Sequence, residues 1–118
     1  MKLEGENLLL RIHLSNFDKW HTGPLYEAIV GRARREHLSG ATVLSGIDGY
    51  VEHGGILGEH PGRLQVERPM VVEIVDQEAA LCRFLETIEP MVRGHRARIT
   101  LERAHVVHYR GGGGEPGT

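Results

Sequence analysis

The stretch that decides the fold is MVVEIVDQEAALCRFLETIEPMV, residues 70–92. Its first six residues are mostly β-branched, which predicts a strand over 70–75. Apolar residues then recur at helical spacing, which predicts an amphipathic helix that buries Leu81, Phe84, Leu85, Ile88, Met91 and Val92. Asp76, between the two elements, is the expected N-cap. Pro90 should kink the helix or end it early.

The first third of the chain shows the same order of strand and helix. Residues 7–14 alternate between two faces, which predicts a strand. One face carries Leu9, Arg11 and His13, and the other carries Leu8, Leu10, Ile12 and Leu14. A helix follows, with Thr22 or Gly23 near its cap and Pro24 in its first turn. Gly40 is its stop signal, and its buried stripe is Leu25, Ala28, Ile29 and Ala33.

Two further strands complete the pattern. Residues 41–51 read as a strand interrupted by Gly46 and Gly49, which indicates a bulge or a place where a ligand approaches the backbone. Residues 98–109 read as the last strand, and a slip in the apolar phase predicts a bulge near Arg103. The order is therefore βαββαβ. It predicts an α+β sandwich in which both helices cover one face of a four-stranded sheet.

Composition limits the class of protein. The chain has 118 residues, 40% of them hydrophobic and 25% charged. We expect one domain over residues 1–110, with a long loop at about 50–68, and a disordered glycine-rich tail over 111–118. The net charge of -2 argues against a nucleic-acid partner.

Three features predict a cytoplasmic protein. The single cysteine, Cys82, excludes an internal disulfide and fits a reducing compartment. Residues 1–6 lack the basic end and apolar stretch of a signal peptide. No apolar run approaches the roughly 20 residues that a membrane span needs.

The sheet face that the helices leave uncovered also carries apolar residues. Leu9 in the first strand, with Val71 and Val75 in the third, point away from the predicted core. Burying a few hundred square ångströms of such surface is worth several kcal/mol, at roughly 25 cal/mol per Å². We therefore expect neighbouring copies of the chain to cover this face.

Five stretches between residues 8 and 109 carry a family resemblance. They are FDK at 17–19, GPLYEAIV at 23–30, GATVL at 40–44, GIDGY at 46–50 and PMVVEIVD at 69–76. Together they resemble the DUF190 family of bacterial and archaeal PII-like proteins, within the nitrogen-regulatory PII (GlnB-like) superfamily. The resemblance implies a ferredoxin-like fold with an antiparallel sheet, assembled as a homotrimer whose sheets face inward.

The same resemblance implies a function in signalling. PII-like proteins bind an adenine nucleotide in clefts between subunits. They use the loop between strands two and three to control a partner, such as a membrane transporter or channel. The chain is then a regulator rather than an enzyme, and it needs no cofactor.

The resemblance also implies where the nucleotide binds. The pocket would combine the loop base, the turn after the second helix and the end of the last strand. Arginine forks suit phosphate oxygens, and Arg96 and Arg98 share strand parity. The expected nucleotide-binding residues are Gly46, Gly49, Tyr50, Gly94, Arg96, Arg98, His108 and Arg110.

Two departures from the PII pattern favour AMP or ADP over a triphosphate. His108 stands where PII proteins have an arginine, so this phosphate contact would depend on pH. The glycine-rich turn is shortened to Gly94-His95-Arg96.

Alternatives remain open from the residues alone. Gly46 and Gly49 also fit a bulge that merely turns the loop. A metal-binding oligomer of similar fold would use His53 and His60, although no metal-ligand pattern supports it. A small enzyme using the intersubunit cleft would need a buried His–carboxylate pair.

Overall fold

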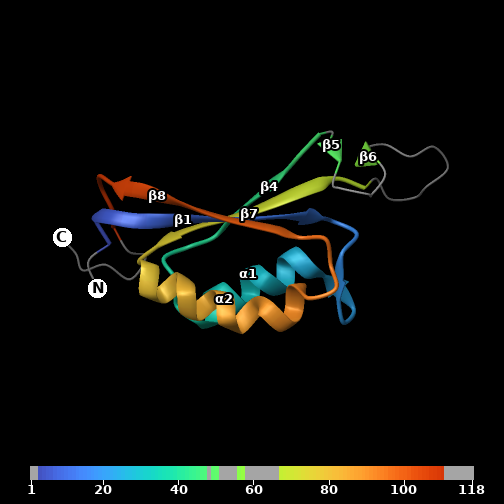
Figure 1. The fold of residues 1–118 in the computed structure, drawn as a ribbon, viewed down its shortest axis with the longest axis horizontal. Coiled ribbons are helices and arrows are strands. Elements are labelled where there is room, and N and C mark those ends of the chain that lie inside the picture. Colours follow the sequence, from blue (N-terminus) through green and yellow to red (C-terminus); the bar gives the residue numbers. More distant parts are fainter. Residues whose placement is uncertain (1–2, 48, 51–55, 58–66, 111–118) are drawn as a thin grey trace.

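A four-stranded sheet and two helices form two layers in the computed structural model, which describes residues 3–47, 49–50, 56–57 and 67–110. The main elements are β1 Gly5–Ser15, α1 Leu25–Arg35, β4 Thr42–Ser45, β7 Pro69–Asp76, α2 Glu78–Val92 and β8 Arg98–Val106. Short ladders are formed by β2 Lys19–Trp20 with β3 Gly23–Pro24, and by β5 Gly49–Tyr50 with β6 Ile56–Leu57. Both helices lie side by side under one face of the sheet (Figure 1).

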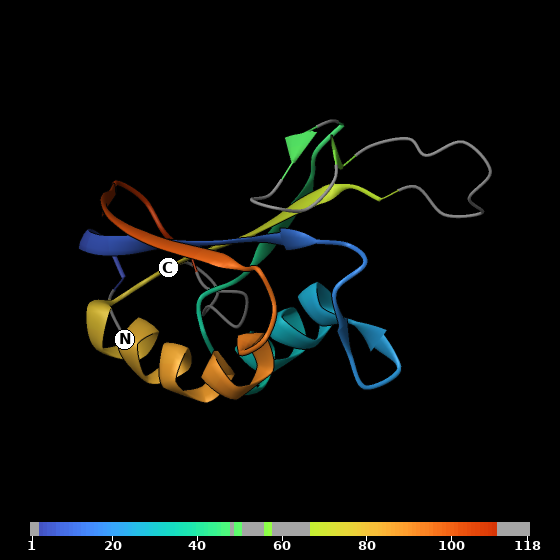
Figure 2. The ribbon, with the colours of Figure 1, turned by 45° about the vertical axis from the view of Figure 1, so that its right-hand side comes forward.

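The sheet has the strand order β4-β7-β1-β8, and every neighbouring pair is antiparallel. With α1 after β1 and α2 after β7, this is the ferredoxin-like arrangement, so the predicted fold class is confirmed. β4 and β7 run beyond the helical layer, and the β5–β6 ladder lies at that end of the sheet (Figure 2).

The core lies between the sheet and the helices, because each strand turns alternate residues toward the helical layer. Phe84 of α2 is the largest fully buried side chain. The predicted stripes of both helices supply the rest of one side of the core. The buried core residues are Leu10, Ile12, Leu14, Leu25, Ile29, Ala33, Met70, Val72, Ile74, Leu81, Phe84, Ile88 and Met91.

The open face of the sheet is less apolar than the sequence pattern predicts. Leu9, Val71 and Val75 lie on this face and are half-buried. A charged row crosses its centre, where Arg11 Nε donates to Glu73 Oε2 at 2.8 Å and the same guanidinium pairs with Glu102. Apolar residues thus flank an ion-paired centre rather than covering the face.

Two predicted features of the strands differ from the structure. β8 pairs with β1 in unbroken register from Arg98 to Val106, so the bulge expected near Arg103 is wrong. The apolar phase shifts because this edge strand has apolar residues on both faces, and Ile99 and Leu101 on the helical side remain exposed. The strand predicted over 41–51 is divided into β4 and β5, which belong to different sheets.

The ends of the helices also differ from expectation. α1 begins at Leu25 with Pro24 itself as N-cap. α2 continues through Pro90 to Val92. A proline so close to the end removes only one hydrogen bond of the helix, so the helix does not end before it. Asp76 is not an N-cap: that position belongs to Gln77, whose side chain makes no cap bond.

The fully buried carboxylate of Asp76 instead joins two segments. It accepts from Ser39 N at 2.8 Å and from Gln77 N at 2.7 Å. The hydroxyl of Ser39 in turn donates to the carbonyl of Val75. These bonds hold the turn after α1 against the end of β7. In the part of the chain that the structure describes, neither helix has the length and apolar character of a membrane span.

Truncating Phe84 should test the core. We expect Phe84→Ala to lower the free energy of unfolding by about 3–5 kcal/mol, because it leaves a cavity between the layers. Cys82→Ala, at an exposed position of the same helix, should change it by about 0.5 kcal/mol or less. Denaturant titration followed by circular dichroism would measure both, and equal midpoints would contradict this account of the core.

Candidate functional site

A tight turn at the end of β1 gathers the polar contacts of one end of the sheet. Asp18 N donates to Ser15 O at 3.1 Å, and Phe17 N donates to Ser15 Oγ at 3.0 Å. Asp18 Oδ2 accepts from Ser15 N at 2.9 Å. Short polar side chains that bond to nearby backbone amides favour turns, which explains why β1 ends here.

The base of the long loop is fastened to this turn. Asn16 N donates to Arg68 O at 3.1 Å, and Arg68 N donates to Asn16 Oδ1 at 2.7 Å. Ser15 Oγ donates to Glu67 Oε2 at 2.9 Å. The chain that leaves the loop toward β7 is therefore held by three hydrogen bonds to residues 15 and 16.

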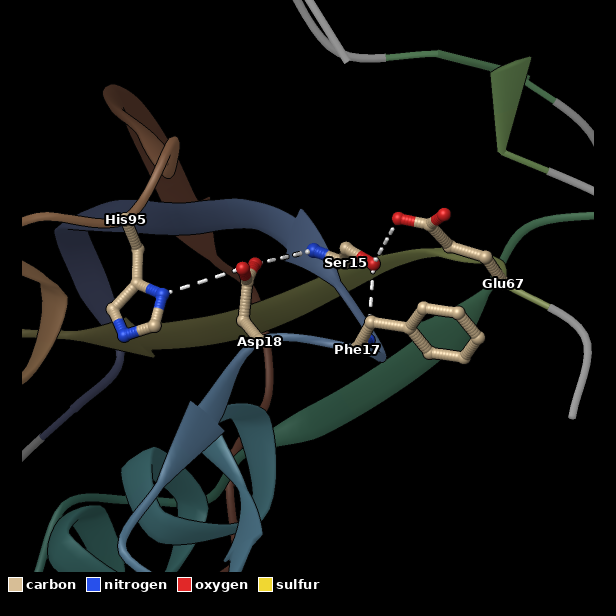
Figure 3. Close-up of polar contacts among 5 residues, drawn as sticks. All are labelled: Ser15, Phe17, Asp18, Glu67 and His95. Atoms are coloured by element: carbon tan, nitrogen blue, oxygen red, sulfur yellow. Dashed lines mark hydrogen bonds and ion pairs between the residues drawn. The ribbon is translucent and has the colours of Figure 1, made fainter. Parts of the chain in front are cut away.

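The turn after α2 reaches the same place. His95 Nδ1 lies 3.3 Å from Asp18 Oδ1, and both side chains are about three-quarters buried, with exposures of 26% and 22%. Figure 3 shows His95, Asp18, Ser15 and Glu67 in one continuous row of contacts. Sequence analysis missed this row, because His95 and Asp18 lie 77 residues apart in the chain.

Gly46 meets protein backbone at the start of the loop. Its N–H donates to Pro69 O at 2.7 Å. A Cβ at this position would lie 2.5 Å from Pro69 Cγ and 3.3 Å from Pro69 O. The absence of a side chain at Gly46 is thus explained by the neighbouring strand. Gly46 opposite Pro69 continues the register in which β4 pairs with β7, so the expected bulge is not found at Gly46.

The other predicted residues of the loop base and the α2–β8 turn lie at this end as well. Gly94 has a φ of +86°, which favours glycine, and the exposed Arg96 follows it. Gly49 and Tyr50 form β5, paired with β6. Arg98 begins β8 opposite His13, so it points to the open face of the sheet.

The last two predicted residues lie at the opposite end. His108 and Arg110 follow the end of β8 and are exposed. β8 has nine residues, so its ends are about 27 Å apart at roughly 3.4 Å per residue. One copy of the chain therefore does not bring His108 and Arg110 to the loop base.

A cleft of about 660 Å³ opens at this far end, between the C-terminal half of α1, the turn after it and the residues after β8. Tyr109 closes one side, and its N–H donates to Glu4 Oε2 at 3.0 Å. The cleft is lined by Val30, Ala33, Arg34, His37, Leu38, Ser39, Gly40, Ala41 and Tyr109. The GATVL stretch marks one wall in the sequence, but nothing local indicates that Tyr109 lies opposite.

A second, shallower hollow of about 600 Å³ lies on the open face. It is lined by Arg11, His13, Arg98, Thr100, Leu101 and Glu102. Burial lowers the pKa of His13, and the positive charges of Arg98 and Arg11 lower it further, while Glu73 acts in the opposite sense. Arg96 is not in the lining, so the shared parity of Arg96 and Arg98 does not bring them into this hollow together.

The two alternative site chemistries fare differently. Within the described ranges no three His, Cys, Asp or Glu side chains are close enough to hold a metal ion. His53 and His60 lie outside those ranges. His95 and Asp18 form a His–carboxylate pair, but the pair is only partly buried, whereas the enzyme alternative calls for a buried one.

The fold is that of solved PII-like proteins. CPII, a nitrogen regulatory PII-like protein from Thiomonas intermedia K12, has this fold. Its structure bound to ADP, AMP and bicarbonate superposes with a TM-score of 0.67, over 91% of this chain and 92% of that chain, at 18% sequence identity. CPII bound to ADP and bicarbonate gives a TM-score of 0.64 at 20% identity, over 91% and 93% of the two chains.

The chain belongs to the DUF190 family, described as "Uncharacterized ACR", whose model matches residues 7–106. The UPF0166 protein of Aquifex aeolicus (strain VF5) is 37% identical over 100 residues, which are 85% of this chain and 92% of the relative. The UPF0166 protein of Methanocaldococcus jannaschii is 33% identical over 103 residues, or 87% and 92% of the two chains. The family resemblance seen in the sequence is confirmed.

Replacing Gly46 should strain the loop base. We expect Gly46→Ala to cost about 1–3 kcal/mol of unfolding free energy, because the new methyl group would collide with the ring and carbonyl of Pro69. Gly23→Ala has open space at the same atom and should change stability by less than about 0.5 kcal/mol. Thermal unfolding of both variants would measure the difference, and similar midpoints would disprove the close approach.

His13 should make stability depend on pH. Its pKa is lower in the folded protein than its ordinary value of 6.5, so the unfolded chain binds the proton more readily. This contribution to stability is complete above pH 6.5 and is lost as the pH falls below it, toward the folded pKa. We expect His13→Gln to reduce the loss of stability between about pH 7.5 and 5.5.

The matched control is His105→Gln, at an exposed histidine of β8 paired with Glu6. Urea titrations across this pH range would compare the two variants with the wild type. An unchanged pH profile for His13→Gln would contradict the lowered pKa.

Proposed function

We propose that this PII-like protein is a regulator that binds an adenine nucleotide, AMP or ADP, in clefts between the subunits of a homotrimer. The observation that carries the proposal is the separation of the expected phosphate contacts. Gly94 and Arg96 lie at one end of β8, and His108 and Arg110 lie at the other. A ligand that touches both sets has to bridge two copies of the chain.

The far-end cleft suits the base of the nucleotide. Gly40 and Ala41 form part of its wall, and small side chains leave backbone N–H and C=O groups open to a base edge. Tyr109 supplies an aromatic surface, and Arg34 a positive charge. The phosphates would then point to the loop base of the neighbouring copy, toward Gly94 and Arg96. That CPII structures contain ADP and AMP supports this choice of ligand.

Occupied sites would control a partner protein, such as a membrane transporter or channel, through the long loop at about 50–68. The loop base is adjacent to the turn that carries Gly94 and Arg96, since His95 contacts Asp18 and Asp18 contacts the residue that holds Glu67. A ligand at this turn can shift the loop only if it binds its two states differently. The protein acts in the cytoplasm on this proposal, without a required cofactor or catalysis.

A shared site can be tested by mixing two defective variants. Arg96→Ala and Arg110→Ala should each weaken ADP binding about tenfold or more, because each removes a charged phosphate contact. In trimers assembled from equal amounts of both variants, half of the subunits keep Arg96 and the other half keep Arg110. A site that takes Arg96 from one subunit and Arg110 from its neighbour is then intact in about a quarter of cases. Calorimetric titration would count these sites.

Three outcomes would overturn the proposal. Wild-type protein that gives no heat with AMP or ADP does not bind a nucleotide. A mixture with no recovered sites means that Arg96 of one subunit and Arg110 of its neighbour do not form a shared pocket. Sedimentation of the wild type as a single subunit at micromolar concentration removes the cleft altogether.

A small enzyme is the second candidate, because His95 and Asp18 bring an imidazole and a carboxylate within 3.3 Å in a partly buried position. The contacts of Ser15 argue against a Ser–His–Asp arrangement: its hydroxyl donates to Glu67 and accepts from Phe17, while Asp18 holds its backbone N–H. Breakdown of ADP by purified protein, abolished by His95→Gln, would favour the enzyme over the regulator.

A further inference from the structure

We propose that Asp18 couples the turn after α2 to the base of the long loop, so that a ligand at residues 94–96 changes how Glu67 and Arg68 are held. This inference rests on the proposed function for the identity of the ligand. It assigns Asp18 a positioning role between two segments that would otherwise respond independently.

Asp18 connects three parts of the fold through separate atoms. Its Oδ2 accepts from Ser15 N at 2.9 Å, at the end of β1. Its carbonyl oxygen accepts from Leu25 N at 2.8 Å, at the start of α1. Its Oδ1 lies 3.3 Å from His95 Nδ1, in the turn after α2. A displacement of His95 therefore acts on a residue whose other bonds reach β1 and α1.

The bonds of Ser15 and Asn16 carry the displacement onward. Ser15 is buried, with 6% exposure, and its hydroxyl bonds Glu67. Asn16 exchanges two hydrogen bonds with Arg68. Pro69 follows directly and is packed against Gly46, so both strands that lead to the loop meet at this point. In Figure 3 the dashed contacts run unbroken from His95 through Asp18 and Ser15 to Glu67.

The His95–Asp18 contact is the place where this row can open. It is the longest of the three contacts that join His95, Asp18, Ser15 and Glu67, at 3.3 Å against 2.9 Å for each of the other two. Gly94, with its φ of +86°, lies beside His95. An anion bound at residues 94–96 would compete with the Asp18 carboxylate for the imidazole, because His95 belongs to this turn and its Nδ1 faces Asp18.

Coupling between two sites is reciprocal. If a ligand at the turn changes the loop base, then a change at the loop base must alter the affinity for the ligand by the same factor. Ser15→Ala removes the hydroxyl that bonds Glu67 and Phe17 N without touching the α2–β8 turn, so it should change ADP affinity, by roughly fivefold or more. Direct contact between Ser15 and the nucleotide is not needed for this effect.

The decisive measurement is hydrogen exchange at the Arg68 amide, followed by NMR on the full chain with and without ADP. In the wild type we expect ADP to change its exchange rate roughly fivefold or more. In Asp18→Asn, which keeps an acceptor for Ser15 N, ADP should still bind but the Arg68 response should disappear. Fluorescence of Trp20, the one tryptophan and two residues from Asp18, reports the same turn.

Glu86→Gln, an exposed carboxylate of α2, is the matched control and should behave as the wild type. A second arm uses no nucleotide: His95→Gln should alter Arg68 exchange in the free protein. No change there, or an Arg68 response that persists in Asp18→Asn, overturns the coupling. If the wild type does not bind ADP but His95→Gln alters Arg68 exchange, the nucleotide is rejected as the ligand, and the coupling between the α2–β8 turn and the loop base is supported.

Discussion

Strand β1 pairs along most of its length with β7 on one side and with β8 on the other, and the rest of the molecule is arranged around this pairing. Side chains alternate across a sheet, so a slip of one residue would turn Arg11 into the core and Leu10 out of it. The register is therefore strongly specified. It also sets Ser15 opposite Pro69, which determines where the chain leaves the long loop and enters β7.

The layers could be predicted from the sequence because both helices have clear apolar stripes and β1 and β7 alternate regularly. Prediction failed where burial no longer controls the pattern. On the edge strand β8, Ile99 and Leu101 are exposed on the helical side. A change of the apolar residues from one face to the other in this strand is therefore not a sign of a bulge. Asp76 is a residue type that often caps a helix. In the structure its carboxylate instead accepts a hydrogen bond from the backbone N–H of Ser39, which belongs to another segment.

The candidate site was predicted less completely, for a topological reason. A family resemblance identifies positions along the sequence. It pointed to residues near both ends of β8, with Gly94 near one end and His108 near the other. It does not say that these ends lie on opposite sides of a subunit. The His95–Asp18 contact and the wall formed by Tyr109 depend on segments brought together only by folding.

The close approach of Gly46 to Pro69 has a consequence for how this family diverges. The two residues occupy one small volume on neighbouring strands, so neither can change in size alone. Among homologues a side chain larger than hydrogen at position 46 should be accompanied by loss of the proline ring at position 69. Correlated changes at positions 46 and 69 in aligned sequences would reflect this steric limit at the loop base.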